Sequence, residues 1–422
     1  MKKTVGAFIV LFVTVLVIGG AWAQSLPTAK PEQVGMSSER LARLGPALKG
    51  QVANERFPGA VVLVARKGKV VYFETVGQRD PATGAPMTKD AIFRLYSMTK
   101  PFTSVAAMIL VEEGKLLLAD PVSKYLPELA NLQVALTETT DGKTTYRLVP
   151  AERPITIQDL LRHTSGLAYA NNTLNEQVKT AYATIGVDWR DVTPTEQIQR
   201  LAQAPLAHHP GTMWEYSLST DVLGRVVEKV SGMTLSALLT ERLFVPLKMS
   251  DTMFLVPREK VARLAQPFAI DKATGKPITL LDVTVPQKND AGGAGTAGTT
   301  GDYARFVQML ANGGQLDGTR LLGRATVSYM TSDHLGTIKP AIALLQPGYG
   351  FGLGFAVRKE TGVNSVPGSA GEYNWGGAAG TGFWIDPKEA LICVLMTQTV
   401  PGPAQRFDRA LVRHLVYQAI VE

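Results

Sequence analysis

Ser97 and Lys100 are the residues whose types and spacing most clearly allow covalent chemistry. They lie in the stretch Y-S-M-T-K-P-F-T (96–103), which leads into an apolar run. Side chains three residues apart share one face of a helix, so the lysine amine is expected beside the serine hydroxyl. A serine hydroxyl becomes a useful nucleophile when a base removes its proton, and a buried lysine can be that base. The alternative is that Ser97 only caps the helix and Lys100 is solvated.

Two further stretches could complete such a site. In W-E-Y-S-L-S-T-D (214–221), the hydroxyl of Tyr216 could relay protons, unless this tyrosine is an ordinary core aromatic. In Y-N-W-G-G-A-A-G-T-G-F-W-I-D-P (373–387), small residues beside a strand would let a substrate approach backbone N–H groups. Such N–H groups are the donors that an oxyanion hole requires. The alternative for this second stretch is a tight glycine turn between two strands.

The strands and helices expected from the sequence pattern, which must position these residues, form one sheet and a block of helices. The β-rich runs 59–66 and 69–76 predict a hairpin, and apolar runs near the C-terminus predict more strands. Further expected elements are strands over 350–357, 380–386 and 390–397, and helices over 37–54, 97–114, 156–163, 194–203, 219–231, 300–312 and 403–420. We therefore expect an α/β (α+β) fold with an antiparallel sheet flanked by helices and a mostly helical insertion. The expected sheet domain comprises 24–96 and 286–422 and the helical domain 97–285, with the active site in the cleft between them.

The N-terminus predicts export. Met1-Lys2-Lys3, the apolar run 5–18 and Ala21-Trp22-Ala23 together form the pattern of a signal peptide, residues 1–23, cleaved before Gln24. An uncleaved anchor is the alternative, but the apolar run is short for a bilayer span. We therefore expect a periplasmic or secreted protein with no stable membrane span after cleavage.

Composition and charge narrow the classes of partner. With 422 residues and 45% hydrophobic side chains, the chain can bury a large core. Its net charge of +7 comes from scattered Lys and Arg, which argues against nucleic acid as a partner. Cys393, the only cysteine, lies in A-L-I-C-V-L-M and is expected to be a buried core residue rather than a reactive thiol. The oligomeric state stays open.

Taken together, the S-x-x-K motif, the tyrosine stretch and the glycine-rich strand resemble the serine β-lactamase and penicillin-binding protein superfamily. Within it, the chain looks most like class C β-lactamases and their esterase relatives, the family VIII carboxylesterases. Further supporting stretches are G-K-L-L-L-A-D-P-V-S-K-Y-L-P (114–127), I-T-I-Q-D-L-L-R-H-T-S-G-L (155–167) and Y-S-L-S-T-D-V-L-G-R-V-V-E (216–228). The resemblance runs from about residue 33 to the C-terminus and implies a β-lactamase/transpeptidase-like fold.

The resemblance also implies a role for each matching residue. Ser97 would be the acylated nucleophile, Lys100 its base partner and Tyr216 the catalytic tyrosine. The backbone N–H groups of Ser97 and Ala378 would form the oxyanion hole. The implied substrate-binding residues are Leu218, Trp375, Gly376 and Gly377. Which of Lys100 and Tyr216 acts as the base in each step stays open.

Two departures from the β-lactamase pattern favour an ester as the small-molecule substrate. Leu218 stands where an asparagine would bind the side-chain amide of a β-lactam, and Trp375 replaces the K-T-G lysine that would hold its carboxylate. Losing such a charged partner costs on the order of 2 kcal/mol of binding. The resemblance therefore implies a secreted carboxylesterase on short to medium acyl esters, with weak β-lactam hydrolysis. A class C-like β-lactamase, a D-amino-acid peptidase and a non-catalytic penicillin-recognising binder remain alternatives.

Other patterns in the sequence do not indicate a function. Gly293 to Gly298 match G-x-G-x-x-G, but no strand precedes them, so we expect no dinucleotide site. His163 is better explained by a helix that ends with Gly166 as its stop than by Ser165 acting as a second nucleophile. The sequence has no H-E-x-x-H motif and no G-x-S-x-G elbow, so we expect neither a metal, nor another cofactor, nor an α/β-hydrolase.

Overall fold

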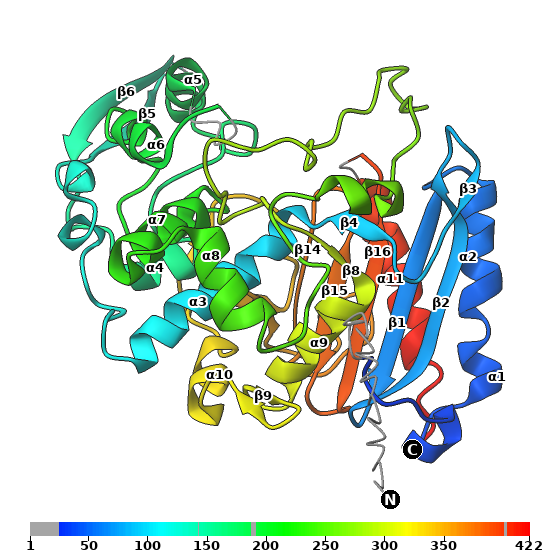
Figure 1. The fold of residues 1–422 in the computed structure, drawn as a ribbon. Helices are drawn as coiled ribbons and strands as arrows, with labels where there is room; N and C mark the ends of the chain where they lie inside the picture. Colours follow the sequence, from blue (N-terminus) through cyan, green and yellow to red (C-terminus); the bar gives the residue numbers. More distant parts are fainter. Residues whose placement is uncertain (1–24, 142, 187–190, 401–402) are drawn as a thin grey trace, which may run out of the picture.

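An antiparallel sheet organises the chain in this computed structural model (Figure 1). The structure describes residues 25–141, 143–186, 191–400 and 403–422, so the predicted signal peptide lies outside it. The eight described strands of the sheet have the order β12-β13-β14-β15-β16-β1-β2-β3, and β16 pairs with β1. The strands are β1 (Gly59–Arg66), β2 (Lys69–Asp80), β3 (Ala85–Pro86), β12 (Tyr349–Phe351), β13 (Ala356–Arg358), β14 (Tyr373–Gly376), β15 (Gly382–Asp386) and β16 (Leu391–Thr397). The expected α/β fold, with a sheet built from both ends of the chain, is confirmed.

Helices cover both faces of the sheet, so every residue of β1 is buried. Side chains alternate across a strand, and Val61 and Leu63 belong to the larger core, together with residues of α3 (Lys100–Glu112) and α9 (Thr300–Ala311). Val62 and Val64 face a smaller core on the opposite side, with residues of α2 (Leu44–Ala53) and α11 (Pro403–Tyr417). Cys393 is buried in this smaller core as predicted, and burial raises the pKa of its thiol.

The remaining elements form the helical part and its connections to the sheet. The other α-helices are α1 (Ser38–Leu41), α4 (Ile157–Leu161), α5 (Glu176–Ile185), α6 (Pro194–Leu201), α7 (Ser219–Ser231), α8 (Leu235–Leu239) and α10 (Arg324–Met330). The short strand pairs are β4 (Ile92–Arg94) with β8 (Ala297–Thr299), β5 (Gln133–Thr140) with β6 (Lys143–Pro150), β7 (Met213–Trp214) with β11 (Lys339–Pro340), and β9 (Gln315–Leu316) with β10 (Thr319–Arg320). Figure 1 shows α4 to α8 gathered on the left of the view, with the sheet on the right. The domain boundaries at 96/97 and 285/286 stay a prediction.

Two expected elements are divided in the structure, and one hairpin was not expected. The expected strand over 350–357 is two strands, β12 and β13, because the chain turns between them and Gly354 takes a φ of 102°. The expected helix over 37–54 is broken into α1 and α2. The β5–β6 hairpin lies within the part expected to be helical, and its Asp141-Gly142 dipeptide was a hairpin signal that could have predicted it.

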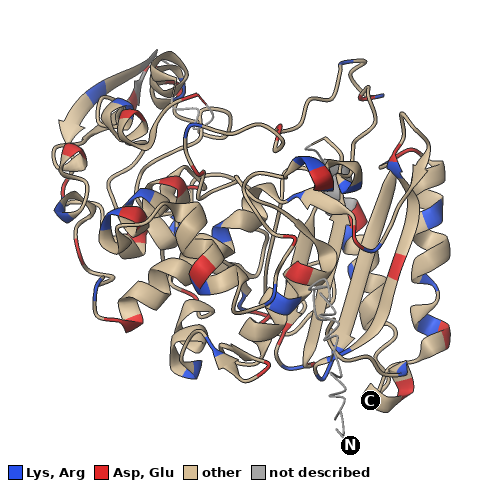
Figure 2. Ribbon diagram, viewed as in Figure 1, with Lys and Arg blue, Asp and Glu red and all other residues tan. Residues whose placement is uncertain are grey.

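Charged side chains are interspersed along the chain. Figure 2 shows both Lys and Arg and Asp and Glu distributed over the helices and over the connections between strands. In the part of the chain that the structure describes, no helix has the length and apolar composition that a bilayer crossing requires.

Candidate active site

Ser97 stands at a sharp turn between β4 and α3. Tyr96–Thr99 form a 3₁₀ turn, so the helix expected over 97–114 starts as 3₁₀ and continues as α3. Tyr96 has a φ of 47°, a left-handed conformation that costs an aromatic residue about 1–3 kcal/mol. The Tyr96 hydroxyl accepts a hydrogen bond from the Leu281 N–H at 2.7 Å, which helps to hold this turn. Ser97 is thereby presented, partly exposed, on the wall of a cavity.

Lys100 is a buried side chain with three hydrogen-bond acceptors around its amine. It is 1% exposed. Its Nζ lies 3.4 Å from Ser97 Oγ, 3.1 Å from the Tyr169 hydroxyl and 2.9 Å from the Gly293 carbonyl oxygen. An ammonium group has three donors, and these acceptors match them. The structure therefore brings Ser97 and Lys100 together and places a cation beside the serine hydroxyl.

Tyr169 connects Lys100 to the buried carboxyl group of Asp221. Neither residue was predicted from the sequence to belong to the site. The Tyr169 hydroxyl donates to Asp221 Oδ2 at 3.4 Å, and the Gly293 N–H donates to Oδ1 at 3.0 Å. Burial raises the pKa of Asp221, and the charge of Lys100 opposes that rise. Burial, and then the charge of Asp221, raises the pKa of Tyr169 well above its usual value. Asp221 ends the stretch 214–221 and was therefore within reach of the sequence argument, whereas no local pattern marked Tyr169.

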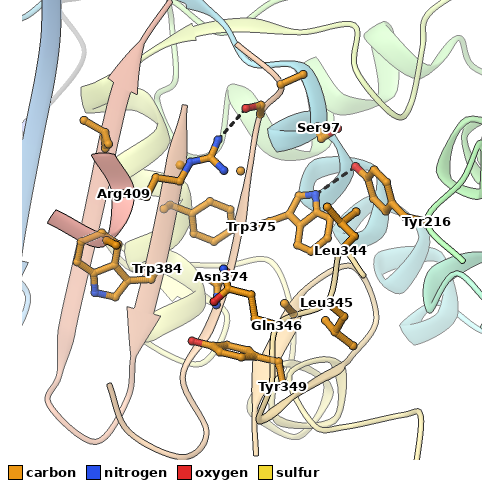
Figure 3. Close-up of a pocket in the computed structure, with 18 of the residues that line it drawn as sticks. Ser97, Tyr216, Leu344, Leu345, Gln346, Tyr349, Asn374, Trp375, Trp384 and Arg409 are labelled. Carbon is orange, nitrogen blue, oxygen red and sulfur yellow. Dashed lines mark hydrogen bonds between the residues drawn. The ribbon is translucent and has the colours of Figure 1, made fainter. Parts of the chain in front are cut away.

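Tyr216 lies with its ring over Lys100. The distance from Lys100 Nζ to the ring centroid is 4.6 Å, a cation–π contact. Trp375 Nε1 donates a hydrogen bond to the Tyr216 hydroxyl oxygen at 3.2 Å (Figure 3). Both neighbours would stabilise negative charge on this oxygen if the tyrosine lost its proton. The structure thus brings the predicted tyrosine to the serine–lysine pair.

His163 and Ser165 support this arrangement from the interior. His163 packs against Tyr216 with ring centroids 4.8 Å apart, and its Nδ1 accepts the Ser217 N–H at 3.3 Å. Burial, followed by the charge of Lys100, lowers the pKa of His163 well below its usual value, so the ring is neutral and can accept this bond. Ser165 is fully buried and its Oγ is 2.7 Å from Ser219 Oγ.

Gly166 is not the cap of α4, contrary to the sequence argument. The helix ends at Leu161, five residues earlier. Gly166 instead takes a φ of 82° where the chain passes the His208 carbonyl, and a Cβ there would lie 2.2 Å from that oxygen. A glycine is needed at this position because two backbone segments meet, not because a helix stops.

The glycine-rich stretch at the end of β14 passes close to Ser97. A Cβ at Gly377 would lie 2.3 Å from the Leu95 carbonyl oxygen, so glycine lets this turn approach the segment before the nucleophile. The predicted site residues that line one cavity are Ser97, Tyr216, Trp375, Gly376, Gly377 and Ala378. Their roles as nucleophile, oxyanion donors and substrate contacts stay predictions.

Leu218 is the one predicted substrate-binding residue that the structure does not bring to the wall of this cavity. It is 4% exposed and packs in the larger core, where it precedes the first residue of α7. Among the described residues that form the cavity wall, Leu218 is absent. Its side chain lies in the interior at the start of a helix whose residues from Ser219 to Val227 are all buried.

The cavity beside Ser97 has a volume of about 670 Å³. Leu344 and Leu345 line it near Trp375, and Gln346, Tyr349 and Asn374 add polar groups farther from Ser97 (Figure 3). The segment that carries Leu344 is attached to the helical part because β11 pairs with β7, which ends two residues before Tyr216. The wall near the serine is therefore mainly apolar and comes from both parts of the molecule.

The loop that matched G-x-G-x-x-G contacts Lys100 and Asp221 through its backbone. The two backbone groups of Gly293 bond to Lys100 and Asp221, and a Cβ at Gly293 would lie 2.4 Å from Asp221 Oδ2. The loop leads into β8 and α9, so its glycines pack around the lysine and its carboxylate partner. Within the described ranges, no group of three or more His, Cys, Asp or Glu side chains is arranged to hold a metal ion.

Known proteins are similar to this chain over most of its length. The beta-lactamase family matches residues 46–418. Protein Rv1367c of Mycobacterium tuberculosis (strain ATCC 25618 / H37Rv) is 36% identical over 357 residues, which cover 81% of this chain and 86% of that protein. Esterase EstB of Burkholderia gladioli is 32% identical over 386 residues, 85% of this chain and 90% of that protein. The solved structure of EstCE1, a hydrolase with promiscuous acyltransferase activity, has a TM-score of 0.74 and 30% identity, covering 90% of this chain and 99% of that one.

Proposed function

Because the chain belongs to the beta-lactamase family and is a serine hydrolase, we propose that it is a carboxylesterase for short to medium acyl esters, with weak β-lactam hydrolysis. The observation that carries this proposal is the 3.4 Å contact between Ser97 Oγ and buried Lys100 Nζ, at a wall where Trp375 replaces a cation. A lysine at position 375 would attract the carboxylate of a β-lactam or of a peptide terminus. An indole offers no charge to such a group, and it favours an uncharged ester.

In the proposed acylation step, the Ser97 hydroxyl loses its proton as its oxygen attacks the ester carbonyl carbon. Lys100, as an ammonium group, has an acceptor for each of its three donors, so in this scheme Tyr216 is the base and starts as a phenolate that receives the proton. The Lys100 cation stabilises that phenolate before the transfer and the negative charge that develops on the serine oxygen during it. The oxyanion is held by the N–H groups of Ser97 and Ala378, and the alcohol takes the proton from Tyr216 as it leaves.

Deacylation in this scheme runs through the same groups. A water molecule gives a proton to Tyr216 while its oxygen attacks the acyl carbon, and the second oxyanion occupies the same hole. Ser97 Oγ then leaves as the carboxylic acid forms and takes the proton back from Tyr216. The buried Asp221, reached through Tyr169, keeps the Lys100 cation balanced throughout.

The test is hydrolysis of p-nitrophenyl butyrate and nitrocefin side by side by wild-type protein and by Ser97→Ala. We expect faster turnover of the ester, and a loss of at least about 10³-fold of both activities in Ser97→Ala. Ser328→Ala is the matched control, because Ser328 is an exposed residue of α10. Nitrocefin as the better substrate, or ester hydrolysis that survives Ser97→Ala, would contradict the proposal. A series of p-nitrophenyl esters from acetate to palmitate then measures the acyl length that the cavity accepts.

We also propose that the enzyme works outside the cytoplasm. This part of the proposal rests on the signal-peptide pattern of residues 1–23, which lie outside the described residues.

A further inference from the structure

Arg409 of α11 contacts the turn that follows β14. Its Nη2 donates to the carbonyl oxygens of Gly377 at 2.7 Å and Thr381 at 2.5 Å (Figure 3 shows Arg409 beside the strand). The Gly377 N–H also donates to the Thr381 carbonyl at 2.9 Å. The guanidinium therefore bonds two carbonyls of a turn that this backbone bond already closes, and a side chain of the C-terminal helix supports the turn beside Ser97.

Gly376 and Gly382 provide the space for this guanidinium. They are direct partners across the β14–β15 pair. A Cβ at Gly376 would lie 2.6 Å from Arg409 Cζ, and a Cβ at Gly382 would lie 3.0 Å from Arg409 Nε. A Cβ at position 376 would displace the guanidinium and one at position 382 would press against it, so the two glycines leave the space in which it lies against the sheet.

The bond to Gly377 acts on one particular peptide plane, whose carbonyl also accepts the Gly380 N–H at 3.2 Å. The Gly377 carbonyl and the Ala378 N–H belong to the same peptide unit, which is trans. In a trans peptide these two groups point to opposite sides, so a carbonyl held toward Arg409 directs the Ala378 N–H away from Arg409. A cation on the carbonyl also polarises the peptide and strengthens its N–H as a donor. Ala378 and Ser97 line the same cavity.

The same turn is fixed against the nucleophile's own segment. The Thr381 hydroxyl donates to the Leu95 carbonyl oxygen at 3.4 Å, two residues before Ser97. Arg409 therefore helps to set the spacing between the two peptide units that carry the predicted oxyanion donors. Arg413 lies one turn farther along α11 and lines the same cavity, but it donates to Glu372 and not to this turn.

We propose that Arg409 is a positioning residue for the oxyanion hole: it locks the Gly377–Ala378 peptide with its N–H directed at the oxyanion formed on Ser97. The inference rests on the proposed function, because an oxyanion forms there only when Ser97 attacks a carbonyl. Arg409 itself touches no reacting atom in this scheme and acts through the Gly377 carbonyl.

The experiment compares Arg409→Ala and Arg409→Lys with wild type in two assays. The first gives kcat and KM for p-nitrophenyl butyrate. The second gives the inhibition constant of an alkyl trifluoromethyl ketone, which forms a charged hemiketal on the serine. Removing an oxyanion donor outright lowers kcat about 10²–10³-fold. Arg409→Ala removes only the support of such a donor, so we expect kcat to fall about 10- to 100-fold while KM stays unchanged. The inhibition constant of the ketone should rise by the same factor in Arg409→Ala. Both constants should change less in Arg409→Lys. Added methylguanidine should restore part of the kcat of Arg409→Ala.

Val412→Ala is the control for loosening of α11, because Val412 is fully buried on the same helix and packs in the smaller core. It should lower the unfolding temperature and leave the ketone affinity as in wild type. A rise in KM at constant kcat, an unchanged ketone affinity in both Arg409 variants, or an equal loss in Val412→Ala would overturn the proposal. If Arg409→Ala does not fold, the kcat and the ketone inhibition constant of Arg409→Lys test the proposal instead. If wild type bound the ketone but did not hydrolyse the ester, the esterase proposal would fail, and the ketone affinities would still decide the role of Arg409.

Discussion

At the scale of single residues, Trp375 does more than remove a cation from the cavity wall. Its Nε1 is the hydrogen-bond donor to the Tyr216 hydroxyl, and its ring packs against the Tyr216 ring at 5.1 Å between centroids. In the proposed scheme, one indole therefore discourages anionic substrates and also supports the tyrosine that receives the serine proton. Specificity and proton transfer are coupled through this side chain.

We predict that Trp375→Phe lowers kcat about tenfold, because a hydrogen bond to a charged group, here the Tyr216 phenolate of the proposed scheme, contributes about 1.5 kcal/mol or more. KM for p-nitrophenyl butyrate should change little, since the aromatic wall is retained. Trp214→Phe is a matched control in the same aromatic cluster, because the buried Trp214 Nε1 has no hydrogen-bond partner among the described residues. Steady-state kinetics of the two variants check the prediction, and equal losses in both would show that cluster packing, not the hydrogen bond, is responsible.

The candidate site was predictable where its residues are close in sequence. Ser97 and Lys100 are three residues apart, so the start of one helix fixes their contact and the sequence reveals it. The other partners of Lys100 come from 69 and 193 residues away, so their approach depends on how the two parts of the molecule pack. Leu218 shows the converse error, because the family resemblance placed it in the site, whereas in the structure it packs in the larger core at the start of the buried part of α7.

At the scale of elements, α9 is attached to the neighbouring loop by a buried carboxylate. Asp302 lies in the first turn of α9, and its Oδ2 accepts the Asp251 N–H at 2.7 Å and the Thr252 hydroxyl at 3.0 Å. Burial raises the pKa of Asp302 from 3.8 to about 6. The folded protein therefore binds a proton here between pH 6 and 4 that the unfolded chain does not bind, and this group's contribution to stability rises as the pH falls through that window.

We predict that the unfolding temperature of Asp302→Asn, relative to that of wild type, is highest at pH 7. This difference should shrink as the pH falls from 6 to 4. The asparagine oxygen can keep the Asp251 and Thr252 bonds while the buried charge is removed. Thermal unfolding of both proteins from pH 7 to pH 4 measures the difference in unfolding temperature. A difference that stays constant with pH would contradict this account.

Asp159→Asn gives a contrast of opposite sign. Asp159 is fully buried, and although burial acts to raise its pKa, the bonds from Arg153, Thr156 and Thr164 outweigh this and hold it at about 2. Its contribution to stability is complete above about pH 4 and is lost as the pH falls toward 2. The destabilisation caused by Asp159→Asn should therefore be largest near neutral pH and shrink only below pH 4.

The prediction of strands from the sequence was wrong where a turn interrupts a continuous run of strand-forming residues. The run over 350–357 has the composition of one strand, yet the turn that includes Gly354 folds it back as β12 and β13. This division has a consequence for the site, because β13 pairs with β14 only as far as Asn374. Trp375 and Gly376 therefore have no partner in β13, on the edge of β14 where the cavity lies.

At the scale of the whole molecule, the two ends of the described chain are joined. Ser37 N–H donates to the Ala419 carbonyl at 2.8 Å, and Val421 N–H donates to the Gly35 carbonyl at 3.0 Å. Arg66 of β1 also donates to the carbonyl oxygens of Val34 and Gly35. The segment 25–36 is thus attached to the sheet and to the C-terminus, and α11, which carries Arg409, is held between these contacts and the sheet.

We predict that a chain lacking residues 1–23 unfolds at the same temperature as the full chain, whereas one lacking residues 1–36 unfolds roughly 5–10 °C lower. The first deletion removes none of the described contacts. The second removes the buried side chains Leu26, Val34 and Met36, each of which stabilises the fold by about 1.5–3 kcal/mol. Thermal unfolding of the three proteins measures this difference, and mass spectrometry of protein exported by a bacterial host tests whether the mature chain starts at Gln24. Export with residues 1–23 retained would contradict the proposed cleavage, and equal unfolding temperatures for both deletions would show that the N-terminal contacts do not support the fold.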